Sequence, residues 1–143
     1  MPNGSLEGRP YVRRIVDAEL DTLLPALPAL SIEGPKAVGK TETALQRAAT
    51  VYRLDDSGER AVAEADPARL AQGRIPILVD EWQRVPESWD VVRRAVDEDP
   101  SPGRFLLTGS ATPTEQPTHS GAGRIVTVRM RPMTLAERGV AEP

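Results

Sequence analysis

The chain has 143 residues, of which 39% are hydrophobic and 27% charged, and this balance predicts one soluble globular domain. It has no cysteine and a single histidine, which excludes disulfides and thiolate metal sites and argues against a histidine metal centre. The net charge is −3 and arginines alternate with acids, so we expect no surface dedicated to nucleic acid or to anionic membranes.

The first residues predict a flexible leader and a protein of the cytoplasm. Residues 1–10 are rich in Pro, Gly and Asn, which is typical of a loose segment ahead of a core domain over residues 11–143. They contain no apolar signal core, and no later stretch approaches the roughly 20 apolar residues of a membrane span.

Apolar residues then recur at helical spacing from Val12 to Leu24, which predicts a helix that ends at Pro25.

Strands and helices alternate along the rest of the chain. The predicted strands are apolar runs over residues 27–33, 51–54, 75–80, 104–107 and 124–130. The predicted helices lie over residues 41–49, 58–72 (one or two short helices) and 88–99, the last with Ser88 as its N-cap. This alternation predicts an α/β fold, with helices covering both faces of a parallel sheet. We expect Trp82 and Trp89 to pack around the end of strand 75–80 rather than to stack on a base.

The loop after the first strand contains both lysines of the chain. Residues 34–41 read GPKAVGKT, which satisfies the pattern G-x-x-x-x-G-K-[ST] between a predicted strand and a predicted helix. The two glycines can adopt backbone angles forbidden to other residues, so the loop N–H groups can surround a phosphate. Lys40 would reach the β and γ phosphates, and the Thr41 hydroxyl would bind Mg²⁺. The predicted nucleotide-binding residues are Gly34, Pro35, Lys36, Ala37, Val38, Gly39, Lys40, Thr41 and Glu42.

Two of these residues would act on the phosphates only through their charge, and the loop has a simpler interpretation. Lys36 would add positive potential at the rim, whereas Glu42 would weaken phosphate affinity unless its carboxylate points to solvent. The simpler interpretation is an ordinary glycine turn that caps a helix.

Two acids end the most apolar strand. Asp80 would hold Mg²⁺ through water, and Glu81 would orient and deprotonate the attacking water, a combination typical of nucleotide hydrolysis. The alternative is an acidic pair that ends a strand at the surface. Their mutual repulsion would be relieved by a nearby divalent ion.

Three further residues are candidates for catalysis. Thr108 and Ser110 stand at the carboxyl end of strand 104–107, where α/β sheets bind ligands, and one of their hydroxyls would sense the γ phosphate. Otherwise they only cap a strand end. Arg124 follows a loop-like segment over residues 111–123 and would act as an arginine finger, in cis or from a neighbouring subunit. The alternative for Arg124 is a surface arginine that opens a strand.

Taken together, these motifs resemble the ATPase domain of a group of prokaryotic two-domain proteins of the AAA superfamily, in the branch with an extra strand between the Walker A and Walker B strands. The resemblance extends from YVRRIVDAEL through GPKAVGKT and ILVDEWQRVP to RPMTLAERG. It implies a P-loop NTPase three-layer sandwich of about five mainly parallel strands, with the FLLTG strand between the strands of Ser31 and Asp80. It also implies that residues 11–14 lie near the base and Arg124 in a nucleotide-responsive region.

Relatives often carry Arg and Gln at positions 36 and 37, and they continue into a second domain, whereas this chain ends at Pro143. The resemblance thus implies that a lid and an effector domain are absent here. We expect a Mg²⁺-dependent ATP-binding module with residues for hydrolysis, whose partner is a second copy or the missing C-terminal domain. The alternatives are an ATP-binding switch with little or no hydrolysis, a small-molecule kinase and a DNA-associated regulatory module. GTP is disfavoured because no Asn-Lys-x-Asp motif occurs.

Overall fold

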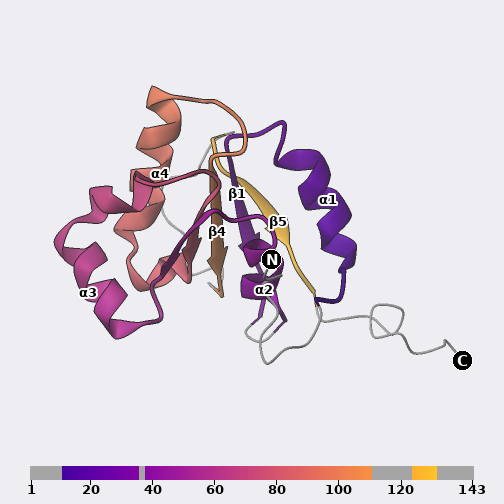
Figure 1. Cartoon of the computed structure of the whole chain (residues 1–143), viewed down its shortest axis with the longest axis horizontal. Coiled ribbons are helices and arrows are strands. Elements are labelled where there is room, and N and C mark those ends of the chain that lie inside the picture. Colours follow the sequence, from indigo (N-terminus) through magenta and orange to yellow (C-terminus); the bar gives the residue numbers. More distant parts are fainter. Residues whose placement is uncertain (1–10, 36–37, 111–123, 132–143) are drawn as a thin grey trace, which may run out of the picture.

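A five-stranded sheet forms the centre of the computed structural model, which describes residues 11–35, 38–110 and 124–131 (Figure 1). Its strands run in the order β2-β3-β4-β1-β5, and every neighbouring pair is parallel. They are β1 (Ala29–Glu33), β2 (Thr50–Arg53), β3 (Ile77–Asp80), β4 (Phe105–Gly109) and β5 (Val126–Arg129). The structure confirms the predicted α/β class, the five strands and the position of β4 between β1 and β3.

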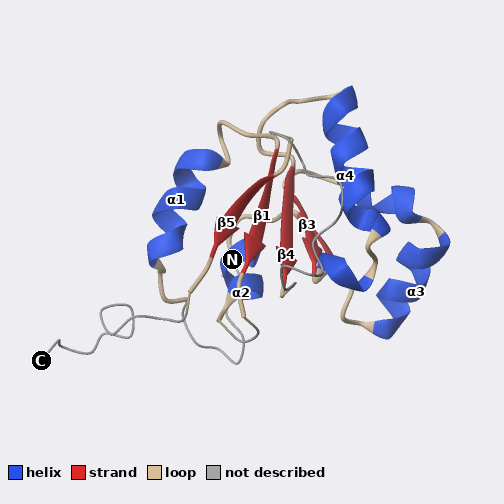
Figure 2. Cartoon of the chain, turned by 180° about the vertical axis from the view of Figure 1, so that it is seen from behind, coloured by secondary structure: helices blue, strands red, loops and turns tan. Residues whose placement is uncertain are grey.

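Helices cover both faces of this sheet. Helices α1 (Ile15–Leu23) and α2 (Lys40–Leu45) pack on one face, whereas α3 (Ser57–Ala65), the 3-10 helix η2 (Pro67–Ala71) and α4 (Glu87–Glu98) pack on the other. Figure 2 shows α1 and α4 on opposite sides of the strands. Strands β1, β3 and β4 are buried along their whole length, as expected where both sheet faces are covered. The three layers are those of the predicted sandwich.

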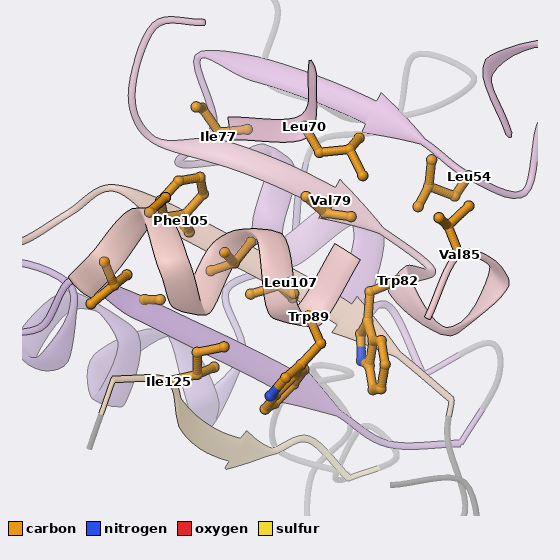
Figure 3. Close-up of a cluster of buried hydrophobic side chains, with 14 of the residues drawn as sticks. Leu54, Leu70, Ile77, Val79, Trp82, Val85, Trp89, Phe105, Leu107 and Ile125 are labelled. Atoms are coloured by element: carbon orange, nitrogen blue, oxygen red, sulfur yellow. The ribbon is translucent and has the colours of Figure 1, made fainter. Parts of the chain in front are cut away.

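The face beneath α4 holds the larger apolar cluster, which Figure 3 shows around Phe105 and Leu107. Trp82, in the 3-10 helix η3 (Trp82–Arg84), lies within it beside Trp89, with ring centroids 4.9 Å apart. Both side chains are almost fully buried. The prediction that the two tryptophans pack around the end of the Asp80 strand is therefore confirmed. Their packing fixes the turn that follows β3.

Some predicted boundaries are wrong, and tertiary contacts explain why. The helix predicted over residues 41–49 ends at Leu45, because the N–H of Ala49 already donates to the Pro76 carbonyl oxygen at 2.8 Å, next to β3. Ser88 is not an N-cap: α4 begins at Glu87 after Pro86, and the Ser88 hydroxyl instead donates to the Trp82 carbonyl oxygen at 3.1 Å.

Several expectations concern residues that the structure does not describe. The predicted leader (1–10), the loop-like segment (111–123) and the last twelve residues (132–143) lie outside the described ranges, as do Lys36 and Ala37. None of the helices in the described ranges has the length and apolar character of a membrane-spanning segment.

Candidate functional site

The loop between β1 and α2 depends on its two glycines for different reasons. Gly39 has φ 99°, in the left-handed region, and a Cβ placed there would lie 2.8 Å from the Arg14 guanidinium. Gly34 has no positive φ, so the backbone freedom expected of both glycines is used by Gly39 alone. At Gly34 the constraint is space, because a Cβ would collide with the Met130 carbonyl oxygen.

Lys40 places its ammonium inside this loop. The residue is 4% exposed, and Nζ donates to the carbonyl oxygens of Gly34 at 2.9 Å and Pro35 at 2.8 Å. It also donates to Ser110 Oγ at 3.2 Å. The structure thus brings the loop lysine and one predicted sensor hydroxyl together. Because an ammonium bonds more strongly to anionic than to neutral oxygens, phosphate oxygens would replace these acceptors favourably.

Asp80 joins the loop to the neighbouring strand β4. Its Oδ1 accepts hydrogen bonds from Thr41 Oγ1 and from Thr108 Oγ1, both at 2.7 Å, and the residue is 2% exposed. The contact to Thr108 follows from the sheet register, which pairs these two residues directly. Hydroxyl and carboxylate oxygens are ligands that Mg²⁺ prefers, and it usually completes its shell with water and phosphate oxygens. The oxygens of Thr41 and Asp80 therefore fit the predicted metal.

Glu81 adopts a strained backbone conformation directly after β3. Its φ of 59° and ψ of 54° are left-handed, the one such case among the described non-glycine residues, and strain of this kind costs about 1–3 kcal/mol. The N–H of Glu81 donates to Thr108 Oγ1 at 3.0 Å, and its Oε1 accepts from Gln83 Nε2 at 2.7 Å. Strain held in place by such contacts is characteristic of functional sites.

These residues surround one cavity of about 340 Å³. It lies at the carboxyl ends of the strands, and its lining residues are Gly39, Lys40, Thr41, Glu42, Asp55, Asp80, Glu81 and Arg84. Asp55 and Arg84 were missed by the sequence analysis. Both come shortly after a strand, β2 and β3 respectively, and this position in a parallel sheet was the signal that could have identified them.

Arg124 is not brought to this cavity within its own chain. It precedes β5, at the amino end of the sheet, where its guanidinium forms an ion pair with Asp97 of α4. The loop lysine lies beyond the carboxyl end of β1, and a strand of this length spans roughly 15 Å. A role for Arg124 in the site of a neighbouring subunit stays a prediction.

A buried polar cluster lies behind α2, and of its members the sequence analysis placed only Tyr11 near the site. Asp17 is 1% exposed, accepts a hydrogen bond from the Tyr11 hydroxyl at 2.8 Å and forms an ion pair with Arg47 at 2.8 Å. The Tyr11 hydroxyl also lies 2.8 Å from Thr43 Oγ1 on α2. Burial raises the pKa of Tyr11 to about 12, so the phenol stays protonated around neutral pH. An acid on the apolar face of a predicted helix was the available signal.

Comparison with known proteins gives one family match and two curated relatives. The sequence matches the model of a family described as "AAA domain" over residues 27–138. Curated relatives include an uncharacterized protein of Mycobacterium bovis and one of Mycobacterium tuberculosis, each 32% identical over 133 residues. The alignment covers 89% of this chain but 30% of each mycobacterial protein. The chain therefore spans less than a third of the length of these relatives.

Proposed function

The chain belongs to the AAA domain family, and on this premise we propose that it binds ATP with Mg²⁺ and carries the residues that hydrolyse the nucleotide. Family membership implies nucleotide binding. The observation that best supports the finer proposal is the convergence of Lys40, Thr41, Asp80 and Glu81 on one cavity at the end of the sheet. A calorimetric titration with MgATP, set out at the end of the Discussion, tests it.

Binding would use the loop and the two metal ligands. Lys40 would exchange the carbonyl oxygens of Gly34 and Pro35 for phosphate oxygens, with its ammonium already held at that place. Thr41 and Asp80 would hold Mg²⁺, which would neutralise charge on the phosphate oxygens. Thr108 would keep the Asp80 carboxylate oriented from the neighbouring strand.

Hydrolysis would place one proton on Glu81. The carboxylate accepts a proton from a water molecule whose oxygen forms a bond to the γ phosphorus, while the bond from that phosphorus to the β–γ bridging oxygen breaks. ADP and inorganic phosphate leave. Ser110, whose hydroxyl contacts the Lys40 ammonium, would sense the γ phosphate.

A second function, an ATP-binding switch with little hydrolysis, is favoured by one contact. Glu81 Oε1 is engaged by the Gln83 amide, which would have to release the carboxylate before it could act as a base. The Glu81 variant in the Discussion separates the two functions. In either case, we propose that the nucleotide state acts on a second copy of the chain or on a further domain, since the relatives are much longer.

The Asp80→Asn variant is expected to lose the contribution of Mg²⁺ to ATP affinity. The amide oxygen can still accept the Thr41 and Thr108 hydrogen bonds, but the negative charge that attracts the cation is gone. ATP affinity measured with Mg²⁺ and with a chelator should differ in the wild type and become nearly equal in the variant. Asp90→Asn, in α4, is the control. Equal losses of affinity with and without the metal would argue against the metal role of Asp80.

Besides Lys40, Arg84 is the cation that we expect to contact the γ phosphate within the same chain. It lines the cavity from the 3-10 helix η3, which follows Glu81. Among the described residues, no hydrogen bond or ion pair holds its side chain. Arg84→Ala should weaken ATP binding by roughly tenfold, the value of one charge-assisted hydrogen bond, and ADP binding much less. Affinity titrations with both nucleotides give the comparison.

Arg124→Ala is the comparison at low protein concentration, because Arg124 precedes β5, at the opposite end of the sheet from the cavity. If Arg124 acts in trans, Arg124→Ala should leave ATP affinity unchanged at low protein concentration and lower it only where copies associate.

For Arg84→Ala, equal losses of affinity for ATP and for ADP would contradict a contact between Arg84 and the γ phosphate.

A further inference from the structure

The backbone that leaves β5 forms one wall of the nucleotide loop. The Met130 N–H donates to the Glu33 carbonyl oxygen at 2.7 Å, immediately before the loop begins. The Met130 carbonyl lies so close to Gly34 that no side chain fits there, and the Met130 methyl group would be 3.6 Å from a Cβ on Gly39. Met130 is 1% exposed. The segment that leaves β5 therefore lies beside both glycines of the loop.

Arg14 ties the two segments together. Its guanidinium is the centre of a bridge, in which Nη1 donates to the Val38 carbonyl oxygen at 2.5 Å and Nη2 to the Arg131 carbonyl oxygen at 2.8 Å. The residue is 6% exposed, and its own N–H is anchored on Asp17 Oδ2 at 2.5 Å. A planar guanidinium fixes the spacing of two acceptors, which the point charge of a lysine does not.

This bridge also sets the direction of a loop donor. The peptide bond between Val38 and Gly39 is planar and trans, so its N–H points opposite to its carbonyl. Because Arg14 holds the Val38 carbonyl, the Gly39 N–H points away from Arg14. Two features keep this orientation: the left-handed φ of Gly39, and the guanidinium that fills the space of a side chain there.

We propose that Arg14 is a positioning residue for the nucleotide loop, and that through it phosphate binding is coupled to the backbone at Met130–Arg131. The coupling rests on the proposed function, since it needs a nucleotide in the loop. The Gly39 N–H, aimed by Arg14, donates to a phosphate oxygen. Phosphate binding fixes the Val38 carbonyl, Arg14 holds it more firmly, and the Arg131 carbonyl at the other end of the bridge is held with it.

Amide hydrogen exchange tests the proposal on the full chain, with Arg14→Ala, Arg14→Lys and the control Arg13→Ala. Arg13 is the adjacent arginine, but it is exposed, and among the described residues its guanidinium pairs with Asp21 of α1. Without nucleotide, both Arg14 variants should exchange faster than the wild type at the amides of residues 33, 34 and 38–41 and of Met130, whereas Arg13→Ala should not. Circular dichroism before each run shows that the variants are folded. If Arg14→Ala does not fold, Arg14→Lys gives the result.

With MgATP, the wild type should slow exchange at Met130, and the Arg14 variants should lose this response and bind roughly tenfold more weakly. Exchange at both segments equal to wild type in a folded Arg14 variant would overturn the positioning role. Wild-type binding of MgATP without any change at Met130 would overturn the coupling and leave the proposed function intact. If the wild type binds no MgATP, the proposed function and the coupling fail together, and the exchange without nucleotide still decides the positioning role.

Discussion

Replacing Lys40 with alanine is expected to abolish the thermal stabilisation that MgATP gives the wild-type protein. A ligand at a hundred times its Kd stabilises the folded state by about 2.7 kcal/mol, and the variant should show almost none of this gain. The reason is that the Lys40 ammonium is the buried cation at the centre of the loop, 2.8–2.9 Å from two loop carbonyl oxygens. Without it, phosphate would meet those neutral oxygens directly. Thermal unfolding with and without MgATP measures the effect.

Lys40→Arg is the sharper companion variant. It keeps the positive charge but replaces a slim ammonium with a broad planar fork, which does not fit beside the Gly34 and Pro35 carbonyl groups. We expect Lys40→Arg to lose most of the stabilisation by MgATP as well. That result would show that phosphate binding needs the shape of the Lys40 side chain and not only its charge. If MgATP raises the unfolding temperature of Lys40→Ala as much as that of the wild type, the loop does not bind the phosphates.

Glu81→Gln is expected to lower phosphate release by about 10²–10⁴-fold while leaving ATP binding intact. The amide cannot accept the water proton, yet it is nearly the same size and still reaches Gln83, so the strained turn and the hydrogen bond from its N–H to Thr108 should persist. A single-turnover assay with labelled ATP gives the rate, and a binding titration gives the affinity.

Glu87→Gln, at the exposed start of α4, is the matched control for this variant. Phosphate release at the wild-type rate in Glu81→Gln would show that another group takes the proton. If the wild type itself binds ATP but releases no phosphate, the switch is the correct function and the Gln83 contact is its best structural explanation.

Local patterns were sufficient to predict the sheet and the loop. Some local patterns predict the same structure in most folds, such as an apolar run like ILVD or a glycine-bounded loop between a strand and a helix. The resemblance to AAA proteins added the position of β4 between β1 and β3, which the strand pattern does not contain. Boundaries failed where a distant contact decided them, as with the Ser88 hydroxyl that bonds to Trp82 instead of capping α4.

The parts of the site that escaped prediction depend on which end of the sheet a residue occupies and on what it contacts. Arg124 follows a loop-like segment just as a mobile catalytic arginine would, but the parallel register puts it at the amino end. Arg84 lies in the cavity because η3 turns the chain back over the end of β3. Arg14 meets Val38 across 24 positions of sequence, and its contact with Arg131 spans 117. The periodicity of a single helix or strand does not predict contacts between residues so far apart in the sequence.

The most direct measurement is a calorimetric titration of the folded wild-type chain with ATP in the presence of Mg²⁺. The account predicts saturable heat with one nucleotide bound per chain, and its loss in Lys40→Ala. A titration without saturable heat, on protein that circular dichroism shows to be folded, would contradict the claim that the residues around Gly39 and Lys40 bind phosphate.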